Sequence, residues 1–384
     1  MAIKTDSLHT KAVHAGEPDP RPAGAAVAPI YQSSTFVFGG DSSYDDVHYA
    51  RLSNTPTHDT LHAKLAALEN AEAALVTASG MAAISSSLFA FLKQGDHVLV
   101  QDSLYGGTHM VVHGDLPALG IEVSVFNAAA PETLAGLIRP NTKVIYAETI
   151  SNPLVRVGEL DAIAAFANEH GLVSMIDNTF ASAVNFRPAE HGYSLSLHSA
   201  TKYMNGHTDL IAGAVIGRAD HVETVRHRVN HLGGSLDAHA CFLLHRGVKT
   251  LPLRMERQQK SAMQVAHALE RHANVEAVHY PGLESSASHA AAARLLDGYS
   301  GMLSFGVAGG KQAAHEVQRQ LQIPLAAPSL GGLETLVTLP AETSHVGMTP
   351  AERTAAGVTD GLIRVSIGIE SADDLVADFE QALG

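Results

Sequence analysis

The sequence of 384 residues contains a single cysteine, Cys241, so no disulfide can form within the chain. This absence predicts a reducing compartment. No run of about 18 apolar residues is present, which argues against a membrane-spanning helix. The first residues also lack the charged-then-apolar plan of a secretory signal. We therefore expect a soluble cytoplasmic protein with no membrane partner.

Basic residues are scarce as well. Lys and Arg number 25 against 39 Asp and Glu, a formal net charge of −14. Nucleic acids and anionic lipids attract clustered cations, so we expect no nucleic-acid partner, although a small local anion site remains compatible. The chain lacks a G-x-S-x-G elbow, a strand-linked G-x-G-x-x-G turn and an H-E-x-x-H pair. Its 23 histidines form no tight ligand pattern, so no metal is expected.

Apolar residues make up 46% of the chain and charged residues 17%, which predicts a large folded core. Residues 1–56 are rich in proline but carry Ile30, Tyr31, Phe36 and Phe38, too apolar for a solvated tail. We interpret this segment as an arm that packs on another surface, such as a second subunit. A larger domain is expected over 57–248 and a smaller C-terminal α+β domain over 249–384.

Short apolar runs alternate with amphipathic segments through the larger domain, which predicts a mostly parallel α/β sheet covered on both faces. Strands are expected at 74–77, 97–100, 123–126, 143–148, 172–176, 194–197 and 211–216, and helices from 80, over 131–138 and over 160–168. After about residue 250, a helix is expected around 261–272, with strands at 302–305 and 362–365. Ligands bind at the carboxyl ends of the strands in such sheets.

Three features near strand ends carry the chemistry. Lys202 follows a strand and is flanked by the hydroxyls of Ser199 and Thr201, which suits an amine nucleophile beside a phosphate. Asp177 ends another strand, and residues 79–81 form a strand–glycine–helix turn of the kind that binds anions. Each feature alone has an ordinary explanation. Lys202 could be a surface lysine, Asp177 could cap a helix or form a structural ion pair, and the turn at 79–81 could bind no anion. Together they describe a pocket for pyridoxal phosphate (PLP).

The segment 199–207 (SATKYMNGH) resembles the lysine signature of the Cys/Met-metabolism PLP-dependent enzymes. This family includes the cystathionine and methionine γ-lyases, cystathionine β-lyase, cystathionine γ-synthase and the homoserine-ester sulfhydrylases. The resemblance continues nearly end to end, in the segments 10–16 (TKAVHAG), 29–36 (PIYQSSTF), 49–51 (YAR), 104–107 (LYGG), 148–153 (ETISNP), 246–251 (RGVKTL), 329–332 (SLGG) and 362–370 (LIRVSIGIE). It implies the fold-type I (aspartate-aminotransferase-like) architecture, with PLP bound in the domain 57–248.

The resemblance also implies residue roles. Lys202 would hold PLP as a Schiff base and carry protons, Asp177 would pair with the pyridine nitrogen, and Tyr105 would stack on the ring. The remaining positions implied are Gly80, Met81, Ser199 and Thr201 at the phosphate, Asn152 beside the ring oxygen and substrate, and Arg364 with Ser329 at the substrate carboxylate. In this family Tyr49 and Arg51 reach the phosphate, and Tyr49 the substrate, from the neighbouring subunit, so a homotetramer built from two dimers with shared sites is expected.

The implied reaction is α,γ-elimination from an amino-acid substrate of the cystathionine or methionine γ-lyase type, releasing 2-oxobutyrate, ammonia and a thiol. γ-Replacement, as in cystathionine γ-synthase or the sulfhydrylases, is the alternative, and an unusual substrate such as canavanine is a third. A PLP-fold regulatory module without turnover is disfavoured, because no core residue is missing. The sequence departs from its relatives at Pro328, His109, His113 and His231, whose part in specificity is open.

Overall fold

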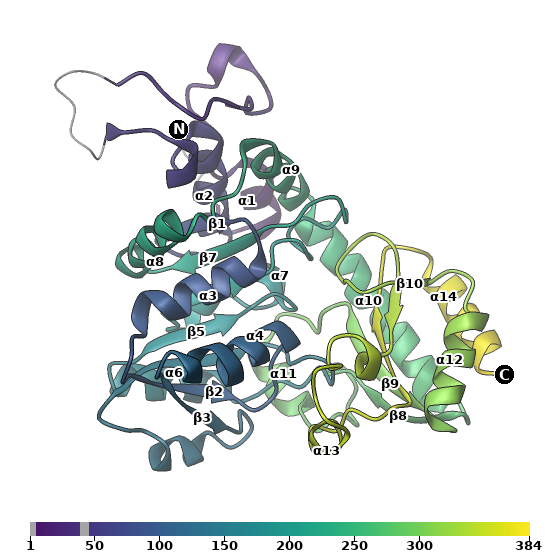
Figure 1. Ribbon diagram of the computed structural model, residues 1–384. Coiled ribbons are helices and arrows are strands. Elements are labelled where there is room, and N and C mark those ends of the chain that lie inside the picture. The colour runs from purple at the N-terminus through teal and green to yellow at the C-terminus, as the bar shows by residue number, and fades with distance from the viewer. Residues whose placement is uncertain (1–4, 39–45) are drawn as a thin grey trace.

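The structure, a computed structural model, describes residues 5–38 and 46–384. Parts of the expected N-terminal arm, residues 1–4 and 39–45, lie outside the described residues. Two β-sheets organise the rest of the chain (Figure 1). The larger sheet is built by strands within residues 73–217 and the smaller one by strands within residues 275–366. The division at 56 and 248 stays a prediction.

The larger sheet has seven strands in the order β1-β7-β6-β5-β4-β2-β3. Its members are β1 (Ala73–Thr77), β2 (His97–Gln101), β3 (Glu122–Phe126), β4 (Thr142–Glu148), β5 (Val173–Asp177), β6 (Leu195–His198) and β7 (Gly213–Gly217). Strands β3, β2, β4, β5 and β6 pair in parallel, whereas β7 runs antiparallel to both β6 and β1. The expected mostly parallel sheet is confirmed.

Successive side chains of each strand feed two different cores, as the two-residue period of a strand requires. Val144 and Tyr146 pack with helix α3 (Gly80–Phe91), while Ile145 and Ala147 pack on the other face with α6 (Leu160–Glu169). Both faces are therefore covered, which explains why the central strands read as continuous apolar runs. Coverage on both faces leaves the strand ends as the place where polar side chains reach a cavity.

The C-terminal sheet has five strands in the order β10-β11-β12-β9-β8. They are β8 (Val275–His279), β9 (Met302–Val307), β10 (Leu325–Ala326), β11 (Leu336–Thr338) and β12 (Leu362–Ser366). Pairing is antiparallel except between β10 and β11. Phe305 of β9 meets Phe379 edge-on in the core that this sheet forms with α10, α12 and α14. A smaller α+β unit was expected here, and the topology agrees.

Helices connect and cover the two sheets. The other α-helices are α1 (Leu8–His14), α2 (Pro56–Leu68), α4 (Gly106–Met110), α5 (Leu116–Ala118), α7 (Ser182–Asn185), α8 (Ala219–Leu232), α9 (Ala238–Val248), α10 (Leu251–Arg271), α11 (His289–Leu295), α12 (Gly310–Gln320), α13 (Pro350–Ala355) and α14 (Ala372–Leu383). Shorter turns are the 3-10 segments Pro22–Gly24, Ala50–Leu52, Pro131–Gly136, Pro188–His191 and Pro340–Glu342, and the π-helical turn Val111–Asp115.

Two helix predictions need correction. The segment 131–138 was expected to be an ordinary helix, but it forms only the 3-10 turn Pro131–Gly136, whose one fully buried side chain, Leu134, cannot support a longer amphipathic face. The helix expected around 261–272 begins ten residues earlier, at Leu251, with a proline in its first turn. The resulting 21-residue α10 runs from the Lys202 region to the C-terminal sheet, so it links the two halves.

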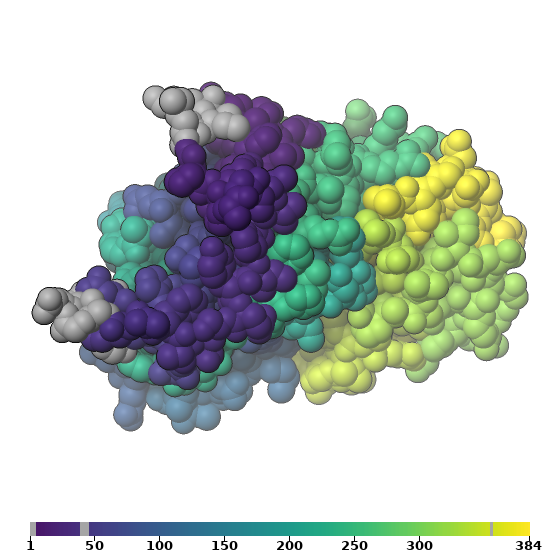
Figure 2. Space-filling model, turned by 90° about the horizontal axis from the view of Figure 1, so that it is seen from above, coloured from purple at the N-terminus to yellow at the C-terminus, as the bar shows by residue number. Residues whose placement is uncertain are grey.

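The N-terminal segment lies on one face of the molecule (Figure 2), where α1 packs on α2 and its His9 pairs with Glu256 of α10. A buried cluster fastens it: the carboxylate of Glu17 faces Lys64 at 3.5 Å, Lys249 at 2.7 Å and His245 at 3.2 Å. Burial opposes ionisation of Glu17, but the lysines outweigh it and lower the pKa of that carboxyl. Among the helices of the described residues, none is long and apolar enough to cross a bilayer.

Candidate active site

A cavity of about 570 Å³ lies where the carboxyl ends of β4, β5 and β6 meet segments of the C-terminal part. It is lined by Ser79, Gly80, Met81, Ile84, Tyr105, Glu148, Ile150, Asn152, Asp177, Thr179, Phe180, Ser199, Thr201, Lys202, Ile211, Pro328, Ser329, Leu330, Thr343, Ser344 and Arg364. Ten of the twelve predicted site residues are in this lining. The strand-end location is the one expected for a parallel sheet.

Lys202 lies in the turn after β6, and its Nζ donates to Ser329 Oγ at 2.9 Å. Burial, assisted by the charge of Arg364, lowers the pKa of Lys202 to about 8. About one-tenth of an amine with this pKa is unprotonated at pH 7, a far larger fraction than for an exposed lysine, so Lys202 can act as a nucleophile or base near neutral pH. The buried environment of Lys202 therefore provides the lowered pKa that an amine nucleophile needs, which the sequence alone does not show.

The turn that carries Lys202 is held from behind by α10. Arg254 donates to the carbonyl oxygens of Tyr203 at 2.7 Å, Met204 at 3.3 Å and Gly247 at 2.9 Å. Its guanidinium is buried, and burial lowers the pKa of Arg254 to about 10. Three carbonyl acceptors satisfy a charged group that would otherwise be costly to bury. The backbone after Lys202 is thus fixed by a residue that the sequence did not single out.

Arg364 brings the C-terminal sheet into the site. It is buried in β12, donates to Asn152 Oδ1 at 3.1 Å and to the Ser329 carbonyl at 3.3 Å, and burial lowers its pKa to about 10. Two of its nitrogens are thereby oriented, and the fork can still present further N–H donors. A carboxylate is the ligand that fits such a fork. Hydrogen bonds therefore join three predicted residues: Arg364, Asn152 and Ser329.

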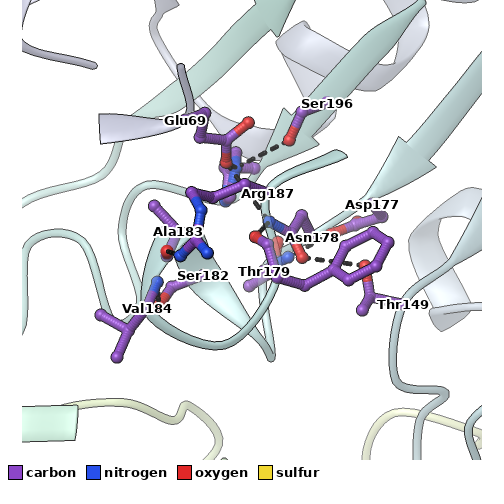
Figure 3. Close-up of polar contacts among 12 residues, drawn as sticks. Glu69, Thr149, Asp177, Asn178, Thr179, Ser182, Ala183, Val184, Arg187 and Ser196 are labelled. Atoms are coloured by element: carbon purple, nitrogen blue, oxygen red, sulfur yellow. Dashed lines mark hydrogen bonds and ion pairs between the residues drawn. The ribbon is translucent and has the colours of Figure 1, made fainter. Parts of the chain in front are cut away.

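Asp177 ends β5 and faces the cavity with a polar network behind it (Figure 3). Its Oδ1 accepts the Thr179 N–H at 2.9 Å. Burial raises the pKa of Asp177, whereas the hydrogen bonds of Thr179 and the charge of His198 act in the opposite direction. His198 is in turn paired with Glu69 at 2.6 Å, deep in the core. A carboxylate so supported is suited to face a cationic nitrogen.

Asn178 extends this network. Its amide Nδ2 donates to the Phe186 carbonyl at 2.9 Å and to Glu69 at 3.3 Å, while Thr149 donates to its Oδ1 at 2.8 Å. The network joins α2, β4 and the loop after β5, so the position of Asp177 is set from several elements. Neither Glu69 nor Asn178 was predicted, because their partners are far apart in sequence.

Four predicted residues, Gly80, Met81, Ser199 and Thr201, all line the cavity and could hold an anion. Gly80 and Met81 open α3, where backbone N–H groups are unpaired, and Ser199 and Thr201 supply hydroxyls. A Cβ added at Gly80 would lie 2.7 Å from the Cβ of Ser199, so only glycine allows the two segments to approach. The hydroxyl of Thr201 also bridges the backbone of Ala212, at 3.0 Å to both N and O.

Glu148 is a cavity residue that no role was predicted for. It ends β4 beside Asp177, and its Oε1 accepts the backbone N–H of Tyr105 at 2.5 Å. Burial and the neighbouring Asp177 raise the pKa of Glu148 well above its usual range. A carboxylate closing an apolar strand was the signal used for Asp177, and the same signal was present here.

Tyr49 and Arg51 are the two predicted residues that this chain does not bring to its own cavity. Arg51 instead donates to the Asn230 carbonyl at 2.7 Å, with its guanidinium 5.5 Å from the Tyr49 ring centroid. Both precede α2, in the N-terminal segment. Thr179, Phe180, Ile211, Thr343 and Ser344 line the cavity and were not predicted. They are apolar or hydroxyl residues without a recognisable pattern.

The donor set fits PLP. The cavity holds a depressed-pKa lysine for an aldehyde, a supported carboxylate for a ring nitrogen, an aromatic side chain at Tyr105 and a helix N-terminus with two hydroxyls for a phosphate. Gly80 provides room at that phosphate end. No group of histidine, cysteine and carboxylate side chains that could hold a metal ion is found among the residues described.

Comparisons with known proteins agree with this reading. The family described as Cys/Met metabolism PLP-dependent enzyme matches residues 9–384. L-methionine gamma-lyase of Fusobacterium nucleatum subsp. polymorphum is 39% identical over 100% of this chain and 99% of its own length, and cystathionine gamma-lyase of Bacillus subtilis (strain 168) is 38% identical over 97% and 98%. The crystal structure of cystathionine gamma synthase from Xanthomonas oryzae pv. oryzae superposes with a TM-score of 0.94 at 37% identity, covering 99% of this chain and 98% of that one.

Proposed function

The chain belongs to the Cys/Met metabolism PLP-dependent enzymes, and from this membership we propose that it catalyses α,γ-elimination from a γ-substituted amino acid. The products are 2-oxobutyrate, ammonia and, from a sulfur amino acid, a thiol. The fold-type I architecture expected from the sequence is that of its structural relatives. When bound, PLP supplies an aldehyde that captures the substrate amine and a ring that takes up electrons from the α-carbon.

The observation that carries the proposal is the meeting of Lys202 and Arg364 at Ser329. The Lys202 amine donates to the Ser329 hydroxyl at 2.9 Å, and the Arg364 guanidinium donates to the Ser329 carbonyl at 3.3 Å. A substrate whose carboxylate is bound by Arg364 would thus present its α-carbon near a base. Lys202 takes the α-proton and, for loss of a γ-substituent, also serves the β-carbon.

The other cavity residues would position the bound cofactor and substrate. Asp177 would keep a proton on the ring nitrogen, Tyr105 would pack on the ring, and Asn152, which already accepts a hydrogen bond from Arg364, would lie beside the ring oxygen. Gly80, Met81, Ser199 and Thr201 would together hold the phosphate.

The lining favours a neutral γ-substituent. Among the cavity residues of the described chain, the only acidic or basic side chains are Lys202, Arg364 and Asp177, which the core chemistry uses, and Glu148, which accepts the Tyr105 N–H. The remaining wall of the cavity is made of apolar side chains, including Ile211 and Leu330, and of uncharged polar groups, mainly hydroxyls. A distal charged group, as on cystathionine, finds no counter-charge on this chain, so we place methionine-like substrates first and cystathionine second. Elimination from canavanine, whose leaving group is attached to Cγ through oxygen, uses the same residues.

γ-Replacement is the second candidate, because the chain superposes closely on a cystathionine gamma synthase. The catalytic core serves both outcomes, and only the fate of the unsaturated product, hydrolysis or capture by a thiol, differs. The test is a substrate panel on purified holoenzyme, scoring 2-oxobutyrate and ammonia from methionine, cystathionine, canavanine and O-acylhomoserines, each with and without cysteine or sulfide. 2-Oxobutyrate from a sulfur amino acid without added thiol supports the γ-lyase. Turnover confined to acylhomoserines, diverted to a thioether by thiol, overturns it.

We further propose that Tyr49 and Arg51 act in the cavity of a neighbouring subunit, within a cytoplasmic homotetramer of two dimers. Their place outside the cavity of their own chain supports this. The arm over 1–56 then forms part of the dimer contact, beside the PLP domain (57–248) and the C-terminal domain (249–384). Mixing two inactive variants, Arg51→Ala and Lys202→Ala, tests the sharing.

In a hybrid dimer of these variants, one site regains both native residues if Arg51 acts across the interface. Random pairing then restores about a quarter of the native activity, since half of the dimers are hybrids with one intact site each. If Arg51 acts within its own chain, no hybrid contains an intact site, and mixing adds nothing. Cofactor retention by Arg51→Ala alone, measured by dialysis and absorbance, is expected to fall.

A further inference from the structure

Two buried carboxyl groups end adjacent strands of the larger sheet. Glu148 closes β4 and Asp177 closes β5, and the two residues are direct partners in the parallel ladder. Both line the cavity in which the cofactor is expected to bind. Only one negative charge is needed opposite a singly charged ring nitrogen. Two ionised carboxylates side by side in a buried site repel each other strongly, so one of them retains its proton.

The groups around the pair decide which one. Asp177 accepts the Thr179 N–H, and the hydrogen bonds of Thr179 together with the charge of His198 oppose the rise in the pKa of Asp177 that burial causes. In the described chain, no ion pair includes Glu148. The titratable groups that bear on it are Asp177 and the buried Tyr146, an anion and a neutral phenol. Asp177 therefore has charged support, and Glu148 has none.

Glu148 also connects two loops that carry site residues. Its carboxyl accepts the backbone N–H of Tyr105 at 2.5 Å and also that of Asn152. Its own N–H is tied to Gln101 Oε1 at 3.0 Å, which fixes the end of β4. One side chain thus sets the positions of the aromatic residue and of the amide that orients Arg364.

We propose that Glu148 is a positioning residue that works as a neutral carboxylic acid, holding the Tyr105 and Asn152 loops while leaving Asp177 as the single charged carboxylate of the site. The raised pKa of Glu148, caused first by burial and then by Asp177, agrees with this assignment. The inference rests on the proposed function only in taking Asp177 as the partner of the ring nitrogen. Its test reads the proton directly and does not depend on which substrate is eliminated.

The first experiment is infrared difference spectroscopy of the holoenzyme at about pH 8, where ordinary carboxyl groups are ionised. Protein labelled with 13C in the glutamate carboxyl is compared with unlabelled protein. We expect a carbonyl band of a protonated acid that shifts with the glutamate label and is missing from Glu148→Gln. Glu316→Gln, a change at an exposed residue of α12, is the matched control and should retain the band.

Two results overturn the proposal. One is a spectrum with no protonated glutamate band, or with a band that survives in Glu148→Gln. The other is a protonated band that shifts only with aspartate labelling and disappears in Asp177→Asn, since the proton then resides on Asp177. Neither result bears on the substrate panel, so failure here is distinguishable from failure of the proposed function.

The positioning role has its own readout. Glu148→Leu removes the acceptor for the Tyr105 N–H, whereas Glu148→Gln retains a neutral acceptor of the same length. An unsatisfied buried N–H predicts that kcat/KM of the leucine variant falls about tenfold or more below that of the glutamine variant. The cofactor absorbance, which reports contacts of the ring, should likewise change more in Glu148→Leu. Equal kcat/KM and equal spectra in the two variants would show that the hydrogen bond from the Tyr105 N–H to Glu148 does not position the site.

Discussion

The amine of Lys202 provides the most direct test of the site electrostatics, through the substitution Arg364→Met. Burial is the larger cause that lowers the pKa of Lys202 to about 8, and the Arg364 charge is the smaller one. At pH 8 about half of such an amine is unprotonated, against about 0.3% for an ordinary lysine, a ratio of roughly 150. Removing the positive charge of Arg364 makes the ammonium form of Lys202 less unfavourable, so the pKa of Lys202 should rise. Because burial is the larger cause, the rise should be less than half of the difference between about 8 and the ordinary lysine pKa.

The assay is competitive acetylation of the apoenzyme across pH, followed by peptide mapping. Lys311 is the internal reference, because it is exposed and the carboxylate of Glu342 raises its pKa. The reactivity of Lys202 should reach its midpoint near pH 8 in the native chain and higher in Arg364→Met. Arg139→Met removes an exposed arginine that pairs with Glu122, and this control should leave the Lys202 midpoint in place.

Three outcomes would refute the reasoning at different points. A Lys202 profile that coincides with that of Lys311 would show that burial does not lower the pKa. An unchanged midpoint in Arg364→Met would show that the two charges do not interact through the cavity. A lower midpoint would reverse the sign of the interaction. None of these readings requires turnover, so they test the electrostatics separately from the reaction.

Three further substitutions probe other groups. Asp177→Asn removes the carboxylate that we propose to pair with the ring nitrogen, so kcat/KM should fall about 10²- to 10³-fold; a variant that retains a tenth of the native activity in steady-state assays would contradict this. Burial lowers the pKa of His245 to about 4. Between about pH 6.5 and 4 the unfolded chain therefore binds more protons than the folded chain, and the free energy of unfolding decreases as the pH is lowered through this window. His245→Gln should reduce that loss by about 2 kcal/mol at pH 5, seen as a smaller drop in thermal-unfolding midpoint from pH 7. Glu69→Leu removes the buried hydrogen-bond partner of His198 Nε2 and Asn178 Nδ2 and should lower the free energy of unfolding by about 2–5 kcal/mol, whereas Glu316→Leu, at an exposed position, should not shift the unfolding midpoint measurably.

Sequence patterns predicted the strands of the larger sheet because those strands are buried on both faces and read as apolar runs. The predicted run 143–148, for example, lies within β4, which begins one residue earlier, at Thr142. Local patterns fared worse where tertiary contacts decide. Pro131–Gly136 has helical composition but only one fully buried residue, and α10 extends back to Leu251 because its first turns pack on the Lys202 loop.

The site was predictable where chemistry depends on a strand end or a helix start. Asp177, Lys202 and Gly80 each followed from such a position, and the family resemblance added Arg364 and Ser329 from the distant C-terminal part. Residues that act through the backbone of others left no comparable signal. Arg254 binds carbonyl oxygens 50 residues away, and Glu148 binds an N–H 43 residues away, so only the folded chain reveals them.

The same geometry explains why reactions diverge among such similar chains. In the proposed reaction, Lys202, Asp177 and Arg364 would serve steps that every γ-substituted substrate shares, and Glu148 would hold the loops around them, so the charged side chains would not distinguish between substrates. Discrimination is left to the apolar and hydroxyl lining, around Ile211 and other uncharged groups. One methylene in such a wall changes the transition-state free energy by only about 1–3 kcal/mol. Relatives at 37–39% identity can therefore share the bonded framework of the site and still differ in their preferred leaving group.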